Sequence, residues 1–123
     1  MPVARSQPGQ AQKESGKDHH MSDTGIIIVD IQGDFTTLKN GSLAVEGTGE
    51  DYISAAAGTA EKLKTAGYPL FATQDWHPEN HISFFTSSPG RNPFDVIEVD
   101  GRSQVLWPPH CVQGTANAGL LLD

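Results

Sequence analysis

An aspartate and two histidines lie close together in one short segment, and side chains of these types can bind a metal ion. Asp75, His77 and His81 occur within the sequence TQDWHPENHISF, in a chain that has only five histidines. In an extended segment, residues two apart point to the same side, so Asp75 and His77 face one point while Trp76 turns away. Pro78 ends the extended segment. A turn there would bring His81 back to the same point.

The ligand types favour some metals over others. Carboxylate oxygen and imidazole nitrogen suit zinc, manganese or ferrous iron better than calcium or cuprous copper. His110 follows two consecutive prolines that stiffen its loop, and it is a candidate fourth ligand. One aspartate and three histidines would leave coordination positions for water or substrate, as catalytic sites require. The pattern alone leaves metal binding and a solvated polar loop as equally good interpretations.

Two apolar segments and one amphipathic segment are placed to position these residues. Residues 25–30 are a β-branched run that ends at Asp30, and they predict a central strand covered by helices on both sides of a parallel sheet. Ligands bind at the carboxyl ends of such strands, although an acid there is nearly as often a helix N-cap. Residues 50–66 carry apolar side chains on one helical face, and residues 69–73 predict a second strand. This order predicts a right-handed βαβ crossover.

Composition limits the classes of protein that fit. A chain of 123 residues with a net charge of −7 fits one domain, and its charge argues against binding to nucleic acid or to a membrane surface. No apolar run is long enough to cross a bilayer. The single cysteine, Cys111, cannot form an internal disulfide. A cytoplasmic protein is expected, with the nucleus as an alternative if the source is eukaryotic.

Two further regions are predicted to lack regular structure. Residues 1–24 are polar and are expected to form a disordered tail, which leaves residues 25–123 as the folded domain. The pair His19 and His20 in this tail would bind a metal only weakly. Residues 87–102 are rich in turn-forming residues and predict a surface excursion, with an extended piece at residues 96–99.

Three separated blocks resemble the nicotinamidase/pyrazinamidase branch of the isochorismatase-like cysteine hydrolases. They are residues 26–35 with 41–45, residues 73–84 and residues 107–115, in the order the family shows. The resemblance implies part of a three-layer α/β/α fold with a parallel sheet, with the C-terminal part missing. It also implies an amidohydrolase of NAD salvage that converts nicotinamide and water to nicotinate and ammonia, with pyrazinamide as a related substrate.

The resemblance assigns roles to seven residues. Asp75, His77 and His81 match the metal ligands, with zinc as the expected ion and manganese or iron as alternatives. His110 matches a neighbouring histidine that is either a further ligand or a residue in contact with the ligands. Asp30 matches the catalytic aspartate, which takes the thiol proton and later protonates the departing ammonia. Phe35 and Trp107 match aromatic walls that sandwich the pyridine ring, although both are equally suited to an ordinary core.

The departures from the family define two interpretations. No residue matches the family's nucleophilic cysteine or its lysine, because Cys111 matches a different cysteine, beside the metal histidine. Gly33 also replaces a common asparagine. The chain is therefore expected to be an incomplete nicotinamidase, inactive alone and completed by an oligomer or a complementing chain. The alternative is an inactive metal-binding or interaction module derived from the family. Either would expose an apolar sheet edge that attracts partners.

Overall fold

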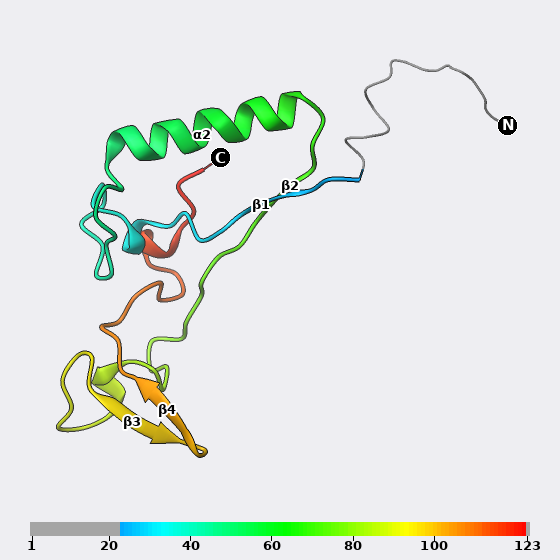
Figure 1. Cartoon of the computed structure of the whole chain (residues 1–123). Coiled ribbons are helices and arrows are strands. Elements are labelled where there is room, and N and C mark those ends of the chain that lie inside the picture. Colours follow the sequence, from blue (N-terminus) through cyan, green and yellow to red (C-terminus); the bar gives the residue numbers. More distant parts are fainter. Residues whose placement is uncertain (1–22, 123) are drawn as a thin grey trace, which may run out of the picture.

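One long helix and a two-stranded parallel sheet form one end of the computed structural model, which describes residues 23–122. Strand β1 (Ile26–Ile28) pairs with strand β2 (Leu70–Ala72), and Ile26 lies opposite Leu70. Helix α2 (Glu50–Thr65) connects the two strands and runs alongside them (Figure 1). The strand–helix–strand order and the parallel pairing are confirmed, so this part is α/β.

The sequence explains where helix α2 begins and ends. Glu50 and Asp51 lie in its first turn, where negative charge is favourable, and two lysines lie in its last turn. Gly67 then adopts a φ of 101°, which an L side chain rarely tolerates. The Gly67 N–H donates to the carbonyl of Lys64, and the Tyr68 N–H donates to the carbonyl of Leu63. These two bonds form a Schellman cap, which stops the helix at the predicted place.

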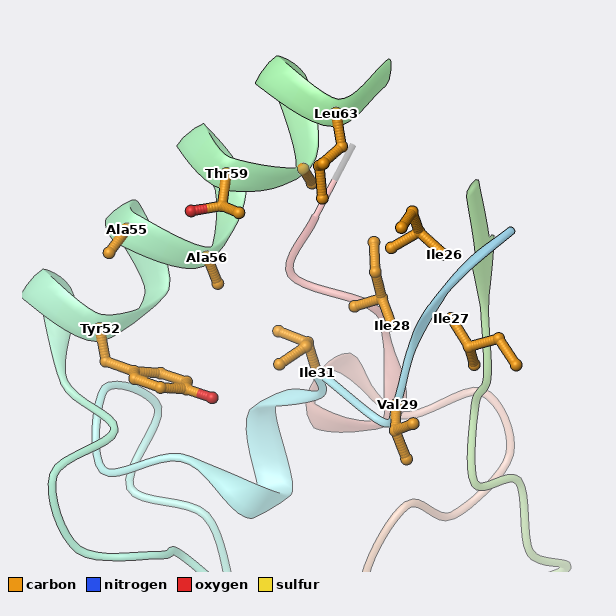
Figure 2. Close-up of a pocket in the computed structure, with 11 residues that line it drawn as sticks. Ile26, Ile27, Ile28, Val29, Ile31, Tyr52, Ala55, Ala56, Thr59 and Leu63 are labelled. Carbon is orange, nitrogen blue, oxygen red and sulfur yellow. The ribbon is translucent and has the colours of Figure 1, made fainter. Parts of the chain in front are cut away.

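Only one face of the parallel sheet is covered within the described residues. Ile28 points toward helix α2, whereas Ile27 points away from it (Figure 2). The side chains on the open side are more than half exposed: Ile27 65%, Val29 64% and Phe71 59%. The expectation of a central strand covered on both sides is therefore not met in residues 23–122. Here β1 has β2 as its one strand partner, and no second helical layer lies on the open face.

A β-hairpin lies at the end of the molecule away from helix α2 (Figure 1). Strand β3 (Val96–Val99) pairs antiparallel with strand β4 (Arg102–Val105). Asp100 and Gly101 connect them, both with positive φ, as the favoured two-residue hairpin turn requires. The extended piece at residues 96–99 is confirmed, and residues 88–95 are turns and irregular segments as expected, but strand β4 was not predicted. The sequence of β4, RSQV, is polar and does not predict a strand, which becomes recognisable only from its pairing with β3.

The most buried residues lie in the loops beyond the sheet. Phe84, Leu106 and Cys111 are fully buried, and so is the polar side chain of Gln32. Three single-turn helices shape these loops: η1 (Gly33–Phe35), η2 (Phe85–Ser87) and η3 (Ala116–Ala118). The C-terminal segment returns to the loop after β1, where the Leu121 N–H donates to the carbonyl of Ile31. These loops therefore form the best-packed region.

The structure of residues 23–122 does not test the predicted N-terminal tail or the predicted cellular location. The tail expected at residues 1–24 falls almost entirely outside residues 23–122, so the boundary of the domain stays a prediction. Within the described range, no helix combines the length and the apolar character that crossing a membrane requires. The cytoplasmic location also stays a prediction.

Candidate metal centre

Three of the four predicted ligands converge on one point. Nε2 of His77 lies 3.4 Å from one carboxylate oxygen of Asp75, and Nε2 of His110 lies 3.5 Å from the other. One ligand atom from each of these residues lies within 4.8 Å of the other two. His110 is buried, and the other two side chains are half-buried. The distances are those of side chains gathered around a shared centre.

The hydrogen bonds of the two histidines leave the inward nitrogen of each ring free. Nδ1 of His77 lies 3.2 Å from the carbonyl oxygen of His110, and Nδ1 of His110 lies 2.9 Å from that of Pro108. A carbonyl oxygen only accepts, so each Nδ1 carries the proton and donates. In neutral histidine, Nε2 then presents a lone pair toward the Asp75 carboxylate. The two Nε2 lone pairs and the negative carboxylate repel each other. A cation placed among these three groups would remove the repulsion, so the donors fit a divalent metal.

His81 lies beside this cluster and not inside it. Its ring centroid is 4.7 Å from that of His77, but its nitrogens are not part of the three-residue group. Nδ1 of His81 lies 2.7 Å from the hydroxyl oxygen of Ser83. The backbone N–H of Ser83 also donates to this Nδ1, at 3.2 Å, so Nδ1 is the acceptor and the proton of a neutral His81 ring lies on Nε2. The role of His81 as a ligand stays a prediction.

Phe84 packs against all three histidines. Its ring centroid lies 5.2 Å from that of His77, 5.8 Å from His81 and 5.4 Å from His110, always edge to face. Phe84 is fully buried. An apolar wall on this side shields the cluster from water, which strengthens electrostatic interactions within it. The sequence prediction assigned Phe84 no role. A large apolar residue at the end of a polar segment with two histidines could have indicated that it packs against them.

Backbone pairing brings the His110 loop to the Asp75 loop. The His77 N–H donates to the carbonyl of Cys111 at 2.8 Å, and the Gln113 N–H donates to the carbonyl of His77 at 2.8 Å. Cys111 itself has a φ of 49°, and its N–H donates to a carboxylate oxygen of Asp34 at 2.7 Å. Three features together fix the direction in which His110 points: the two prolines before it, the hydrogen bond from Cys111 to Asp34, and the parallel bridge between His77 and Val112.

The only cysteine is poorly suited to attack a substrate. Cys111 is fully buried, and burial is the main cause that raises the pKa of its thiol from 9.0 to about 12. Three nearby negative charges add to this shift: Asp75, Asp34 and Asp30. A thiol with a raised pKa carries little of the nucleophilic thiolate at neutral pH. This agrees with the expectation that Cys111 is not the nucleophile.

Asp30 follows strand β1 at the same edge of the sheet as Asp75 follows strand β2. One carboxylate oxygen of Asp30 accepts a hydrogen bond from the Thr73 hydroxyl at 2.6 Å. The Asp30 N–H lies 3.0 Å from the same hydroxyl oxygen. Asp30 has a φ of 51°, in the left-handed region where strained functional residues are often found. It caps no long helix, because the following element is the single turn η1.

The two predicted aromatic walls lie in different surroundings. The ring of Phe35 is 5.8 Å from that of His110, at the edge of the cluster. The ring of Trp107 is 6.0 Å from that of Phe94, edge to face. Among residues 23–122, no ring-to-ring contact joins Phe35 to Trp107. Both side chains are half-buried.

Comparisons with known proteins identify relatives of the chain. No protein-family model matches it. It is 46% identical over 95 residues to a nicotinamidase of Acinetobacter baylyi, an alignment that covers 77% of this chain and 41% of that protein. Among solved structures, a yeast nicotinamidase bound to the inhibitor nicotinaldehyde matches with a TM-score of 0.67 at 28% identity, over 79% of this chain and 48% of that one.

A second solved structure concerns the metal. A pyrazinamidase of Pyrococcus horikoshii in complex with zinc matches with a TM-score of 0.57 at 38% identity, over 80% of this chain and 45% of that one. The chain thus spans less than half the length of the relatives it matches. The Asp75, His77 and His110 cluster and the zinc-bound neighbour together indicate a site for a divalent metal. The chain is thus similar in sequence and fold to nicotinamidases and pyrazinamidases over about four fifths of its length, and it matches less than half of each of them.

Proposed function

We propose that this protein supplies the metal-binding part of an amidohydrolase that converts nicotinamide and water to nicotinate and ammonia. The observation that carries the proposal is the convergence of Asp75, His77 and His110 in a chain whose relatives are named nicotinamidases. One relative, from Mycobacterium tuberculosis, is named nicotinamidase/pyrazinamidase. Nicotinamide and pyrazinamide, two flat aromatic amides, are therefore the substrates to test first.

Zinc is the ion we propose for the centre, with manganese and iron as alternatives. Its donors would be Asp75, His77 and His110, with His81 as a fourth ligand from the adjacent loop. One carboxylate and neutral imidazoles are an ordinary zinc ligand set, and an open position would remain. When bound, the ion would supply a positive charge that holds the ring nitrogen of the substrate. Phe35 and Trp107 would lie on the two faces of that ring.

Asp30 is proposed to move the protons of the reaction. Its carboxylate lies at the carboxyl end of β1, held by the Thr73 hydroxyl, and it is half-buried. From this position it would accept the proton of an attacking thiol and return it to the departing ammonia. Cys111 would not be that thiol, because its raised pKa and full burial oppose attack. The nucleophile would come from polypeptide that corresponds to the rest of the relatives.

The apolar surface of the sheet region supports this need for more polypeptide. Ile28, Ile31 and Leu63 line an open groove of about 550 Å³ between β1 and helix α2 (Figure 2). On the other face, Ile27 and Phe71 are 65% and 59% exposed. Exposed apolar area of this kind marks a contact surface. We infer that the missing part of the family fold covers it, whether it follows in the same protein or belongs to a complementing chain.

Fragment complementation tests the proposal. The full chain is purified alone and co-expressed with the unmatched remainder of the Acinetobacter baylyi relative, and ammonia release from nicotinamide is measured with zinc content alongside. The chain alone is expected to bind zinc without releasing ammonia, and the pair is expected to release it. Asp30→Asn should abolish ammonia release in the pair. Asp51→Asn, on the exposed first turn of α2, is the matched control.

The outcomes separate the two interpretations. Zinc bound without ammonia release from the pair would favour a metal-binding or interaction module. If the chain binds no zinc and the pair releases no ammonia, the assignment of the site is contradicted. Ammonia release that survives Asp30→Asn would contradict the role of Asp30 alone.

A further inference from the structure

The side chain of Gln32 binds both backbone groups of a metal-ligand residue. Its Oε1 accepts from the N–H of Asp75 at 2.8 Å, and its Nε2 donates to the carbonyl of Asp75 at 2.8 Å. The same Nε2 donates to the carbonyl of Ala118 at 2.7 Å. The amide group of Gln32 thus pairs with Asp75 as a neighbouring strand would. Gln32 precedes the single turn η1, 43 residues away from Asp75 along the chain.

The chemistry of the partners fixes the orientation of the Gln32 amide. The Asp75 N–H can only donate, and the carbonyls of Asp75 and Ala118 can only accept. Exchanging oxygen and nitrogen in the amide would lose all three hydrogen bonds. Gln32 is fully buried, so water cannot replace them. A side chain held in this way transmits its own position to the peptide it binds.

We infer that Gln32 is a positioning residue for the metal centre, acting through the backbone of Asp75. It fixes where the Asp75 carboxylate lies relative to Nε2 of His77 and Nε2 of His110. The sequence pattern indicates no role for Gln32 in the metal centre, because a glutamine in a loop carries no metal chemistry of its own. The inference rests on the proposed metal centre but does not require the proposed amidase reaction.

The chain offers a matched control for this role. Nε2 of Gln74 also donates to the carbonyl of Ala118, at 2.9 Å, and Gln74 is the direct neighbour of Asp75. In contrast to Gln32, its side chain makes no hydrogen bond to Asp75. Gln74→Met therefore removes an amide at the same carbonyl while leaving the backbone of Asp75 held. A difference between variants at the two glutamines isolates the contact to Asp75.

Metal affinity and coordination geometry test the inference in the full chain. The zinc dissociation constant is measured by chelator competition, and the visible absorption spectrum of bound cobalt(II) reports geometry, for the unchanged chain and for Gln32→Glu, Gln32→Met and Gln74→Met. Gln32→Glu keeps an acceptor for the Asp75 N–H but turns a carboxylate oxygen toward two carbonyls. Both Gln32 variants are expected to weaken zinc binding by roughly 10- to 100-fold and to shift the cobalt spectrum. Gln74→Met is expected to change neither.

The results distinguish failure of this inference from failure of the metal centre. If either folded Gln32 variant binds zinc like Gln74→Met with an unchanged cobalt spectrum, the positioning role is wrong while the metal centre stands. If the unchanged chain binds neither ion, the metal centre and this inference fall together. Hydrogen exchange in the unchanged metal-free chain gives a check that needs no variant. The Asp75 amide should exchange slowly because Gln32 holds it, and rapid exchange would overturn the inference.

Discussion

The metal centre and the parallel sheet of this protein differ in how completely they are packed. Around the metal centre, Gln32, Phe84 and Cys111 are fully buried, and polar side chains bind specific backbone groups. In the sheet, Ile27 and Phe71 expose more than half of their surface. The two regions are only a few residues apart along the chain. The polar region is the well-packed one, and the apolar region is open.

This difference separates two properties that a complete enzyme combines. The contacts described for the candidate ligands lie within residues 23–122, so we expect the chain to bind a metal without further polypeptide. Burial of the sheet does require it, because apolar area left in water contributes nothing to the free energy of folding. Catalysis and full stability should therefore depend on the rest of the family fold, and metal binding should not.

The largest expected effect concerns the reactivity of Cys111 in the packed region. A pKa of about 12 in place of 9.0 lowers the thiolate fraction at pH 8 by roughly 1000-fold. Alkylation by iodoacetamide should be slower than that of the chain in denaturant by at least this factor. Mass spectrometry of timed samples measures both rates. Equal rates in the two conditions would mean that the region is open like the sheet.

The same raised pKa predicts how stability changes with pH. Between pH 9 and 12, the unfolded thiol has lost its proton while the folded thiol keeps it, so unfolding releases a proton. The Cys111 contribution to the free energy of unfolding is thus fully present below pH 9 and falls as the pH rises, by about 1.4 kcal/mol per unit. Urea melts of the unchanged chain and of Cys111→Ala between pH 8 and 11 check this. Parallel slopes in the two proteins would contradict the shift.

Removal of a ligand inside the cluster comes next in size. Asp75→Ala should weaken zinc binding by more than about 100-fold, because it removes a ligand itself. Replacing a residue that only orients a ligand by a hydrogen bond already weakens metal binding by about 10- to 100-fold. Titration calorimetry of the full chain measures the change. Asp95→Ala is the control, since Asp95 binds the Asn92 N–H in a loop apart from the cluster. Equal losses in both variants would show that the chain binds zinc without a defined centre.

His81 should matter less than His110 to the same affinity. His110 contributes to the three-residue cluster, whereas His81 lies beside it and is bonded to Ser83. We expect His110→Ala to weaken zinc binding by about 100-fold and His81→Ala by about 10-fold or less. The same calorimetry compares them. A larger loss for His81→Ala would place it among the principal ligands and reduce the importance of the observed cluster.

The smallest expected effect is on the open sheet. Phe71→Ser replaces a ring that is 59% exposed, so it should change the melting temperature of the chain by only a few degrees. It should reduce both binding of an apolar dye and activation by the complementing fragment. Glu61→Ser, on the exposed side of α2, serves as control. A strongly destabilised Phe71→Ser chain would show that this face is already covered.

The sequence predicted the elements with a clear period and the ligands with distinctive chemistry. The helix at residues 50–66, the parallel strands and the convergence of Asp75 with His77 follow from spacing and capping residues. Strand β4 was missed because its residues, RSQV, alternate weakly and form a strand only by pairing with β3. Gln32 was missed for a different reason. Its importance lies in a contact 43 residues away, which no local pattern encodes.

Counting the zinc bound by the purified full chain tests most directly whether the centre is complete without the rest of the family fold. The metal is removed with a chelator, zinc is returned, and the tightly bound zinc is measured in the unchanged chain and in Asp75→Ala. The tail histidines His19 and His20 remain in both proteins and cancel in the comparison. We predict one zinc ion per unchanged chain and none in the variant. The same zinc content in both proteins would contradict a metal centre built on Asp75.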